Sequence, residues 1–523
     1  MNITRRPSRQ ARGAFMANYE IINGSRRPTM ILRVPLAVEM LDPSVHAALA
    51  AILPPPALLT ASEDTKPYEC DGLMLYREQP AAVLLPENEA QVVAILRCCF
   101  AAGIAVVARG AGTSLSGGAL PAAGGVVLSL AKFRNIVAID PATRTAIVQP
   151  GVRNLAISEA AAAYGLYYAP DPSSQIACSI GGNVAENAGG VHCLKYGLTV
   201  HNIRRVRGVL ITGDVVEFGG DALDAPGYDL LALITGSEGL LAVITEITVK
   251  LLPKPQFAQV ALAAFADVEH AGAAVGAIIA AGIVPAGLEM MDQAATRAVE
   301  QFVHAGYPQD AAAVLLVESD GTPEEVAAEM AAIKRVLEEA GATEIRVSQD
   351  ERERLLYWSG RKAAFPAVGR ISPDYYCIDG TIPRSALPRV LKEIEAWSAE
   401  FGLVCANVFH AGDGNLHPLI LFDANKPGDK ERTIAFGDRI LDLCIEVGGT
   451  ITGEHGVGVE KLGGMCTQFS TAELERFLAI KAAFDPRGLL NPGKGVPTLA
   501  RCAEFGRMHV HRGELRHPEL PRF

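Results

Sequence analysis

Short apolar runs alternate with amphipathic stretches through the first half of the chain, up to a closely spaced pair of prolines at Pro253 and Pro255. Apolar runs bounded by turn residues predict buried strands, and longer periodic stretches predict helices. The predicted elements are, in order, a strand over 81–86, a helix over 87–103, strands over 104–110 and 124–130, a hairpin over 135–151, a helix over 154–165 and a strand over 240–251. Frequent changes between strand and helix indicate a compact domain with α/β or α+β architecture.

A second α+β unit is predicted beyond Pro255, where the glycine-rich loops disappear for more than a hundred residues. Residues 271–288 carry no charge and reach the length of a membrane span, but they are mostly Ala and Gly and contain Pro285. We therefore expect a buried helix, a turn and a strand there, and no transmembrane segment. The elements expected in this unit are a helix over 264–282, a strand over 314–319, a helix over 323–341 and a strand beginning at 345–347.

The chain has 523 residues, which is too long for one hydrophobic core. We expect an α+β protein with a lead-in over 1–75, one domain over 76–255, a second α+β domain over 256–440 and a C-terminal segment over 441–523. That last segment holds two predicted helices that we expect to pack on the first domain, followed by a tail containing several arginines.

Charge and cysteine content narrow the classes of function. With 47 basic and 58 acidic residues the net charge is -11, which argues against nucleic-acid binding because phosphate contacts need an excess of cations. The 10 cysteines include no C-x-x-C spacing, so neither an iron–sulfur cluster nor a disulfide framework is predicted. The basic N-terminus lacks the apolar core of a signal peptide, and a reducing, cytoplasmic location follows as the expectation.

Three glycine-rich segments of the first half are candidates for holding a large cofactor. The first, residues 107–118, lies between two predicted strands, and its glycines let successive backbone N–H groups converge on a diphosphate. Its spacing fits neither the Rossmann fingerprint nor a P-loop, and a tight connection without ligand remains an alternative. The second segment, residues 169–190, is too poor in apolar side chains to order itself, and the third, residues 235–239, precedes a predicted strand.

These three segments, in this order, resemble the FAD-binding domain of the vanillyl-alcohol oxidase and p-cresol methylhydroxylase family. The resemblance implies that the first two segments hold the FAD pyrophosphate and that the third lies near the adenine–ribose half. Thr113 stands about where members with covalent flavin carry a His, so noncovalent FAD is implied. The implied FAD contacts are Arg109, Gly110, Ala111, Gly112, Thr113, Ser114, Gly117, Gly118, Pro170, Asp171, Ser173, Ser174, Gly181, Gly182, Asn183, Asn187, Gly189, Gly190, Glu238, Ile244 and Asn491.

The C-terminal half contains two further motifs, which bring together imidazole and carboxylate groups. Residues 407–417 place His410 and His417 on either side of a glycine-rich turn, and residues 452–458 contain Glu454 and His455. Two imidazoles and one carboxylate are a common ligand set for a catalytic divalent metal. A single buried histidine is more often a core residue, but these motifs contain three of only 11 histidines.

This pair of motifs resembles that of the FAD-linked 2-hydroxy-acid dehydrogenases, which include D-lactate, D-2-hydroxyglutarate and glycolate enzymes, and several longer segments resemble the D subunits of bacterial glycolate oxidases. The resemblance implies metal binding by His410, His417 and Glu454, usually zinc in relatives, with His455 as the base. Arg361 would hold the substrate carboxylate, although its position in the sequence alone favours a cation on the surface of a helix. Cys377 stands where 2-hydroxyglutarate enzymes have a lysine, which favours a small monocarboxylate.

The resemblance also implies a reaction and an assembly. FAD-dependent oxidation of glycolate to glyoxylate, or of D-lactate to pyruvate, would pass a hydride to flavin N5 while the metal-bound hydroxyl loses its proton to His455. Relatives work with a second flavin-domain-like subunit and an iron–sulfur subunit at the cytoplasmic face of the inner membrane. Two alternatives stay open, a stand-alone D-lactate or other D-2-hydroxy-acid dehydrogenase and a noncatalytic assembly subunit that keeps only the fold.

Overall fold

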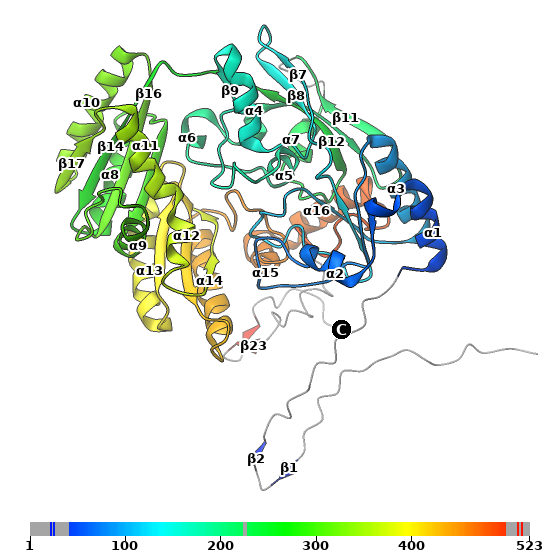
Figure 1. The fold of residues 1–523 in the computed structure, drawn as a ribbon. Coiled ribbons are helices and arrows are strands. Elements are labelled where there is room, and N and C mark those ends of the chain that lie inside the picture. The colour runs from blue at the N-terminus through cyan, green and yellow to red at the C-terminus, as the bar shows by residue number, and fades with distance from the viewer. Residues whose placement is uncertain are drawn as a thin grey trace, which may run out of the picture. The chain divides into compact units, whose positions relative to one another are not determined.

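The computed structural model describes residues 41–222 and 227–497, together with the backbone of four two-residue strands at 21–22, 25–26, 510–511 and 514–515. Contacts divide the chain into a small unit, 1–38, and a large unit, 39–523. Most of the lead-in before residue 41 and nearly all of the arginine-containing tail lie outside the described residues, so the expectations for them stay untested. Everything below concerns the large unit (Figure 1).

The FAD-binding domain predicted over 76–255 contains two larger sheets and one pair of two-residue strands, β9 (Leu166–Tyr167) and β13 (Leu252–Pro253), and every element predicted in its sequence is present. In the first sheet, strands β4 and β5 both pair in parallel with β6, and helix α3 connects β4 to β5. Asn88 caps α3 through its side chain and Gly103 ends it in the left-handed conformation. The elements of this sheet are β3 (Leu58–Leu59), β4 (Ala82–Leu84), α3 (Glu89–Ala102), β5 (Val106–Arg109) and β6 (Val126–Ser129).

The second sheet is antiparallel and has five strands in the order β11-β10-β12-β8-β7. The predicted hairpin is its edge, because β7 and β8 pair across the turn that contains Pro141. Its apolar core is shared with helices α4 and α5. The bounds are β7 (Ile136–Asp140), β8 (Thr145–Val148), α4 (Asn154–Ala161), α5 (Ile180–Glu186), β10 (Ile203–Val209), β11 (Val215–Gly219) and β12 (Val243–Lys250).

Part of the predicted lead-in belongs to this domain. Helix α1 (Pro43–Ile52) contributes Leu49 to the core beneath the first sheet, and β3 extends that sheet by pairing with β4. The boundary placed at residue 75 was therefore wrong for residues 43–59, because a short Ala-rich helix and a two-residue strand carry too weak a pattern to be assigned from sequence.

The second α+β domain, predicted over 256–440 to bind the substrate, is called the cap domain below. It is built on one antiparallel sheet of seven strands, in the order β17-β14-β16-β15-β20-β22-β18. Helices cover both faces, since one apolar core lies beneath α8, α10, α13 and α14 and a second beneath α9, α11 and α12. The strands are β14 (Phe257–Phe265), β15 (Gly287–Asp292), β16 (Ala313–Gly321), β17 (Glu344–Val347), β18 (Asp374–Cys377), β20 (Cys405–Phe409) and β22 (Pro418–Phe422). The helices are α8 (Val268–Ala280), α9 (Gln293–Val303), α10 (Pro323–Glu339), α11 (Glu351–Lys362), α12 (Ala364–Val368), α13 (Leu387–Phe401) and α14 (Asp429–Glu446).

Sequence patterns fail at strand β14, which lies next to the edge strand β17 of this sheet. The helix predicted over 264–282 begins at Val268, and the residues before it form β14, which the sequence did not predict. Alternate residues of β14 enter the two different apolar cores, so the strand lacks the polar face that would mark it as a strand. The predicted helix, turn and strand over 271–288 are confirmed as α8, a turn and the start of β15.

The C-terminal segment is shared between the two domains. Helix α14 continues through the boundary placed at residue 440 and packs on α13 and β22, so the division lies after that helix. Helix α15 (Leu462–Gln468) joins the cap core through Leu462 and Met465. Helix α16 (Thr471–Phe484) contacts both domains, because Leu474 lies in the cap core while Ile480 and Phe484 pack on the core of the five-stranded sheet (Figure 1).

Candidate active site

The first two glycine-rich segments meet, as expected for a shared diphosphate cradle. Gly110 lies so close to Ser179 that any Cβ there would collide with the Ser179 hydroxyl, which is buried and has no protein hydrogen-bond partner. The backbone N of Gly182, at the first turn of α5, lies 3.8 Å from the same Cβ position. Gly112 and Gly117 have φ angles of 71° and 76°, a region that favours glycine. A narrow surface of backbone and one unpaired hydroxyl fits a diphosphate.

Several predicted FAD contacts instead hold the framework together. The Asn491 side-chain amide donates to the backbone carbonyls of Gly118, at 3.0 Å, and Glu238, at 2.6 Å. Both carboxylate oxygens of Glu238 accept backbone N–H groups, from Val457 and Gly458 at 2.7 Å each. Asn491 and Glu238 therefore join the first and third glycine segments to the turn that follows His455, a structural role that the sequence did not predict.

Four more of the predicted contacts also have protein partners. Arg109 donates to the carbonyl of Cys70, Asn187 accepts from the N–H of Val200, and Asn183 accepts from the amide of Asn154. Asp171 accepts from the ring of His192 at 2.9 Å. Direct contact with FAD stays a prediction for these four and for Gly110, Ala111, Gly112, Thr113, Ser114, Gly117, Gly118, Pro170, Ser173, Ser174, Gly181, Gly182, Gly189, Gly190 and Ile244.

The predicted metal ligands come together at the end of the cap sheet. His410 directly follows β20 and His417 directly precedes β22, so the turn between them folds both rings toward Glu454. The Nε2 atoms of His417 and His410 lie 2.8 Å and 3.3 Å from the same Glu454 oxygen. One ligand atom from each residue lies within 4.8 Å of the other two, and both histidines are buried. Two nitrogens and one oxygen converging this closely fit a zinc-type divalent ion.

Burial and hydrogen bonding shift the pKa values of His410 and Glu454 in opposite directions. Burial opposes charge on His410, but the Glu289 and Glu454 carboxylates beside it hold its pKa well above the usual value. Burial likewise opposes ionisation of Glu454, and hydrogen bonds from His410 and His417 nevertheless bring its pKa well below the usual value. A metal ion would replace the proton that now joins these groups, so its binding releases a proton.

The turn that carries Glu454 and His455 is shaped by Asp379. The carboxylate of Asp379 is fully buried and accepts the backbone N–H groups of Gly453, Glu454 and His455 at 3.0–3.1 Å. The ammonium group of Lys461, also buried, donates to the same carboxylate at 2.9 Å. Burial would raise the Asp379 pKa, but Lys461 and the nearby imidazoles lower it, so the carboxylate stays charged. A negative charge bound by three consecutive N–H groups fixes the direction in which His455 projects.

His455 stacks on His417, one of the predicted metal ligands. Its ring lies parallel to that of His417, with an interplanar angle of 8° and centroids 5.0 Å apart, and its Nδ1 atom is buried without a protein partner. Burial lowers its pKa to about 4, so the ring is neutral at pH 7 and able to accept a proton. The sequence does not reveal this loss of hydration, which moves the pKa of the ring away from that of a solvated imidazole.

A second set of possible metal ligands consists of Cys377, His417 and His455. The parallel stacking of the two rings keeps their in-plane lone pairs from converging on one ion. Burial also raises the pKa of the Cys377 thiol well above its usual value, which disfavours the thiolate that metals bind. The set containing Glu454 is therefore the better metal site. Cys377 is therefore a buried thiol whose burial favours the protonated form.

Arg361 is buried within the cap and is not a surface cation. Only 1% of the side chain is exposed, and Nε donates to Glu289 Oε2 at 2.7 Å. Its Nη2 atom is buried and has no protein partner, so at least one N–H-bearing nitrogen is free for a ligand. Glu289 was missed by sequence analysis, because one carboxylate inside the apolar strand β15 gives no motif.

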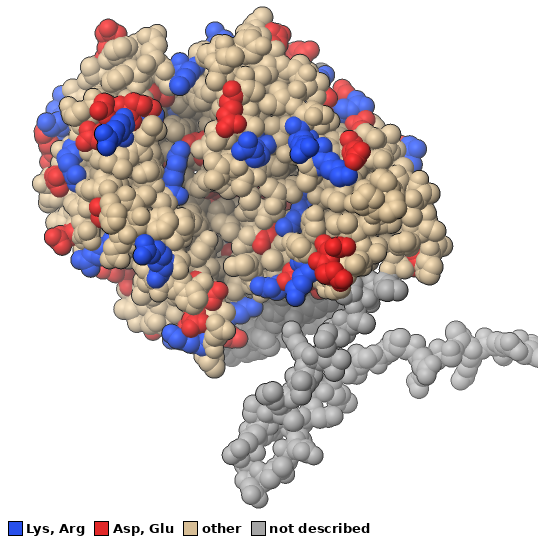
Figure 2. Space-filling model, viewed as in Figure 1, with Lys and Arg blue, Asp and Glu red and all other residues tan. Residues whose placement is uncertain are grey.

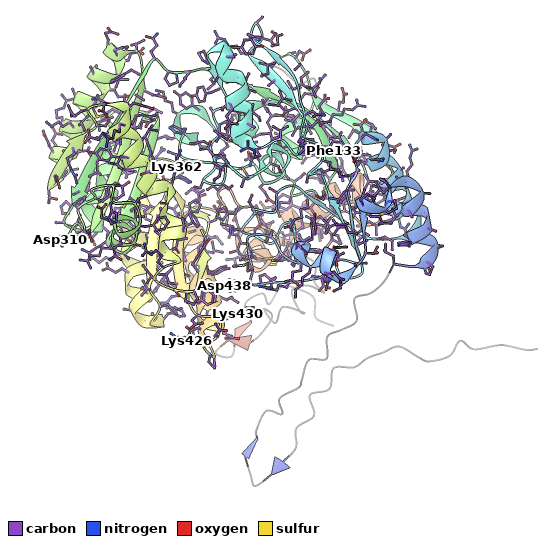
Figure 3. The ribbon with its side chains drawn as sticks, in the orientation of Figure 1. Phe133, Asp310, Lys362, Lys426, Lys430 and Asp438 are labelled. Carbon is purple, nitrogen blue, oxygen red and sulfur yellow. The ribbon has the colours of Figure 1, made fainter. Side chains whose placement is uncertain are left out.

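Contacts join the two halves of the site. A Cβ on Gly189 would lie 2.8 Å from Glu454 Oε2, so the second glycine segment of the FAD-binding domain touches the metal set. A Cβ on Gly117 would lie 2.6 Å from Val459, just beyond the turn that bears His455. Away from the site, Lys430 of α14 donates to the carbonyl of Leu75 at 2.9 Å (Figure 3). The glycine segments and the metal set therefore form one continuous site.

Comparisons with known proteins match both halves of the chain. Residues 80–219 match the family model described as FAD binding domain, and residues 254–495 match FAD linked oxidases, C-terminal domain. The glycolate oxidase subunit GlcD of Escherichia coli is 61% identical over 480 residues, covering 92% of this chain and 96% of that protein. The chain belongs to the FAD-linked oxidase family. A D-lactate dehydrogenase of Anaerostipes hadrus is 31% identical, covering 84% of this chain and 94% of that protein.

Membership of the FAD-linked oxidases also accounts for the fold. The crystal structure of p-cresol methylhydroxylase with substrate bound superposes with a TM-score of 0.75, at 17% identity, covering 86% of this chain and 96% of that one. The predicted α+β architecture with a vanillyl-alcohol oxidase-type FAD-binding domain is confirmed. This FAD-linked oxidase is an oxidoreductase with an FAD-binding domain.

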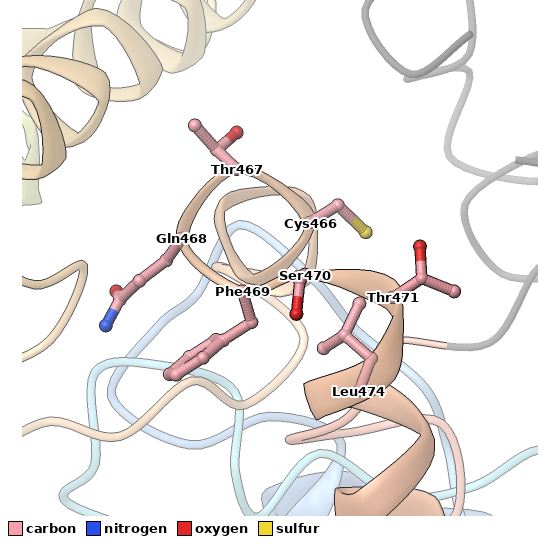
Figure 4. Close-up of a pocket in the computed structure, with 7 residues that line it drawn as sticks. All are labelled: Cys466, Thr467, Gln468, Phe469, Ser470, Thr471 and Leu474. Atoms are coloured by element: carbon pink, nitrogen blue, oxygen red, sulfur yellow. The ribbon is translucent and has the colours of Figure 1, made fainter. Parts of the chain in front are cut away.

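The surface of this FAD-linked oxidase adds two observations. Figure 2 shows a hollow between the cap domain and the FAD-binding domain, with Lys and Arg side chains at its border, which would favour entry of an anion despite the net charge of -11. A separate pocket at the junction of α15 and α16 (Figure 4) is lined by Cys466, Thr467, Gln468, Phe469, Ser470, Thr471 and Leu474. The lining includes neither a histidine nor a carboxylate, so that pocket lacks the groups for acid–base chemistry.

Among the helices that the structure describes, none combines the length and the apolar run needed to cross a bilayer.

Proposed function

We propose that this chain oxidises a small 2-hydroxy acid, with glycolate to glyoxylate as the principal reaction and D-lactate to pyruvate as a second one. The contact between Gly189 and Glu454 carries the proposal, because it brings a segment assigned to FAD and a residue assigned to the metal into van der Waals range. The names of the Escherichia coli and Anaerostipes hadrus relatives support the two substrates. Cys377, where a cation would be needed for a second carboxylate, favours a monocarboxylate.

Each residue of the site has one task in the proposed reaction. Arg361 binds the substrate carboxylate and fixes the α-carbon. His410, His417 and Glu454 would hold a divalent metal, zinc in our proposal, which lowers the pKa of the substrate hydroxyl. His455, neutral at pH 7, accepts the hydroxyl proton at a ring nitrogen as the C–H bond breaks. Noncovalent FAD, held by the glycine segments, supplies the hydride acceptor.

An anaerobic absorbance titration tests the proposal. The purified chain should be yellow and should bleach on adding glycolate, and more slowly on adding D-lactate. His455→Ala should stay yellow without bleaching, because it keeps the glycine segments and loses the base. A colourless protein, or a yellow one that neither acid bleaches, would refute the proposed reaction. Faster bleaching by D-lactate would favour the alternative, a stand-alone D-lactate or other D-2-hydroxy-acid dehydrogenase.

We also propose that the chain acts as the catalytic subunit of a complex. The Escherichia coli relative is named as a subunit, and the sequence contains no C-x-x-C to hold an iron–sulfur cluster of its own. Electrons would pass to an iron–sulfur subunit, alongside a second flavin-domain-like subunit, at the cytoplasmic face of the inner membrane. Affinity purification from the native cell should recover both partners. Persistence of His410, His417, Glu454 and His455 argues against a noncatalytic assembly subunit.

A further inference from the structure

Glu289 contacts two residues of the proposed reaction, the predicted metal ligand His410 and the predicted carboxylate-binding residue Arg361. It is 1% exposed, on β15 in the cap sheet. One carboxylate oxygen lies 2.8 Å from Nδ1 of His410, and the other accepts from Nε of Arg361 at 2.7 Å. One side chain therefore touches a predicted metal ligand and the predicted carboxylate clamp at the same time.

The bond to His410 selects a tautomer. A carboxylate oxygen at 2.8 Å from Nδ1 accepts a hydrogen bond, so the proton of the neutral ring belongs on Nδ1. The lone pair of Nε2 is then directed at Glu454, where the metal set converges. Without the acceptor, the ring would be free to protonate Nε2 or to rotate, and both changes remove a ligand.

The bond to Arg361 limits how that residue binds a ligand. With Nε engaged by Glu289, a substrate carboxylate meets only the terminal nitrogens, one of which is buried and unpaired. The planar guanidinium cannot turn without breaking the Glu289 bond, so its free edge keeps one direction. That direction fixes where the α-carbon of the bound acid lies relative to the metal set.

We propose that Glu289 is a positioning residue that sets the metal-binding tautomer of His410 and the carboxylate-binding edge of Arg361 together. This inference rests on the proposed function, because it concerns the same site. It predicts that metal affinity and substrate affinity are coupled through a residue that touches neither the metal nor the substrate.

Glu289→Gln tests the proposal, since it keeps the volume but places an N–H group against one of the two donors. Chelator-treated protein is titrated with Zn²⁺ in competition with a chromophoric chelator, and KM for glycolate is then measured at saturating Zn²⁺. We expect Zn²⁺ affinity to fall about 10- to 100-fold. KM should rise while the FAD content stays unchanged.

Glu318→Gln is the matched control. Glu318 is also buried, lies on the adjacent strand β16, and accepts from a histidine and an arginine, His192 and Arg354. A merely structural cost of removing such a carboxylate would appear in both variants, whereas only Glu289→Gln should weaken Zn²⁺ binding. If Glu289→Gln does not accumulate as folded protein, Glu289→Asp serves instead. Its shorter side chain cannot reach both partners, so Zn²⁺ affinity should again fall.

The outcomes separate the two proposals. Wild-type protein that neither binds Zn²⁺ nor is reduced by glycolate refutes the proposed function. Wild-type protein that does both, while the Glu289 variant has the same Zn²⁺ affinity and KM, overturns only the role of Glu289. Equal loss of Zn²⁺ affinity in the Glu289 and Glu318 variants overturns it as well.

Discussion

Two buried glutamates on neighbouring strands, Glu289 and Glu318, each join a histidine to an arginine, but only one of these networks is complete. Glu318 accepts from His192 at 3.2 Å and from Arg354 at 2.8 Å, and the Trp358 indole also donates to it. The other ring nitrogen of His192 is bound to Asp171. Both ring nitrogens of His192 and the Glu318 carboxylate therefore have partners within the protein, where the FAD-binding domain meets the cap; we call this the closed network.

The Glu289 network is left open at both ends. Beyond Glu289, His410 reaches only another potential metal ligand, and Arg361 has a buried nitrogen without a partner. Unpaired buried polar groups cost stability, so they persist where a ligand completes them. Glutamate, histidine and arginine thus form a structural contact around Glu318 and a candidate binding site around Glu289. The two networks differ in whether polar atoms remain without a hydrogen-bond partner in the protein.

The largest difference, in glycolate turnover and in metal content, is expected between variants of one histidine from each network. His410→Ala removes a predicted metal ligand from the Glu289 network and should lower glycolate turnover by about 10³-fold, or roughly 4 kcal/mol, and the amount of bound metal with it. His192→Ala should keep the metal, because the closed network has no ligand position. Metal analysis and steady-state kinetics of both variants check this. Equal metal content in the two would remove the distinction.

A smaller difference, in kcat/KM for glycolate, is expected between variants of Arg361 and Arg354. Arg361→Lys keeps the charge but loses the planar edge, and should lower kcat/KM for glycolate about 10²-fold, corresponding to roughly 3 kcal/mol of hydrogen bonding to a charged group. Most of the change should be in KM. Arg354→Lys should leave KM near that of the wild type. A similar KM in both variants would show that Arg361 does not bind the substrate.

The contact between domains offers a further test. Gly189→Ala places a methyl group 2.8 Å from a Glu454 oxygen, so the carboxylate must move and metal affinity should fall by about 10-fold. Gly276→Ala, in α8, adds a methyl group with nothing within 4 Å and serves as the control. Zn²⁺ titration of the two variants measures the effect. Unchanged affinity in Gly189→Ala would mean that Glu454 is not a ligand.

The last expected effect concerns stability, not function, and its dependence on pH in the Glu318 network. Burial opposes charge on His192, but Asp171 and Glu318 raise its pKa well above the usual value. A raised histidine pKa stabilises the fold fully below the unfolded value near 6.5, and this stabilisation is lost as pH rises through the folded pKa. His192→Gln should therefore cost about 2 kcal/mol at pH 6. This loss in the free energy of unfolding should become smaller at higher pH. Urea unfolding of both proteins at several pH values measures it, and a loss that does not change with pH would show that the network does not titrate.

Sequence patterns predicted those parts of the molecule whose character is evident from several consecutive residues. The glycine segments and the turn over residues 410–415 have unusual composition over several consecutive residues, and the structure brings both to the contact between the two domains. Glu289 and Asp379 could not be predicted from pattern, since each is one carboxylate whose importance depends on partners more than 70 residues away. The sheet of the cap was only half predicted, because strands such as β14 are buried on both faces.

The turn over 452–459 is fastened on both sides, to the cap through Asp379 and to the FAD-binding domain through Glu238. Swinging the two domains apart would have to break these hydrogen bonds between backbone amides and buried carboxylates, so we expect the two domains to stay together throughout turnover. Amide hydrogens of residues 453–458 should accordingly exchange slowly with deuterated water, and rapid exchange would reveal a hinge.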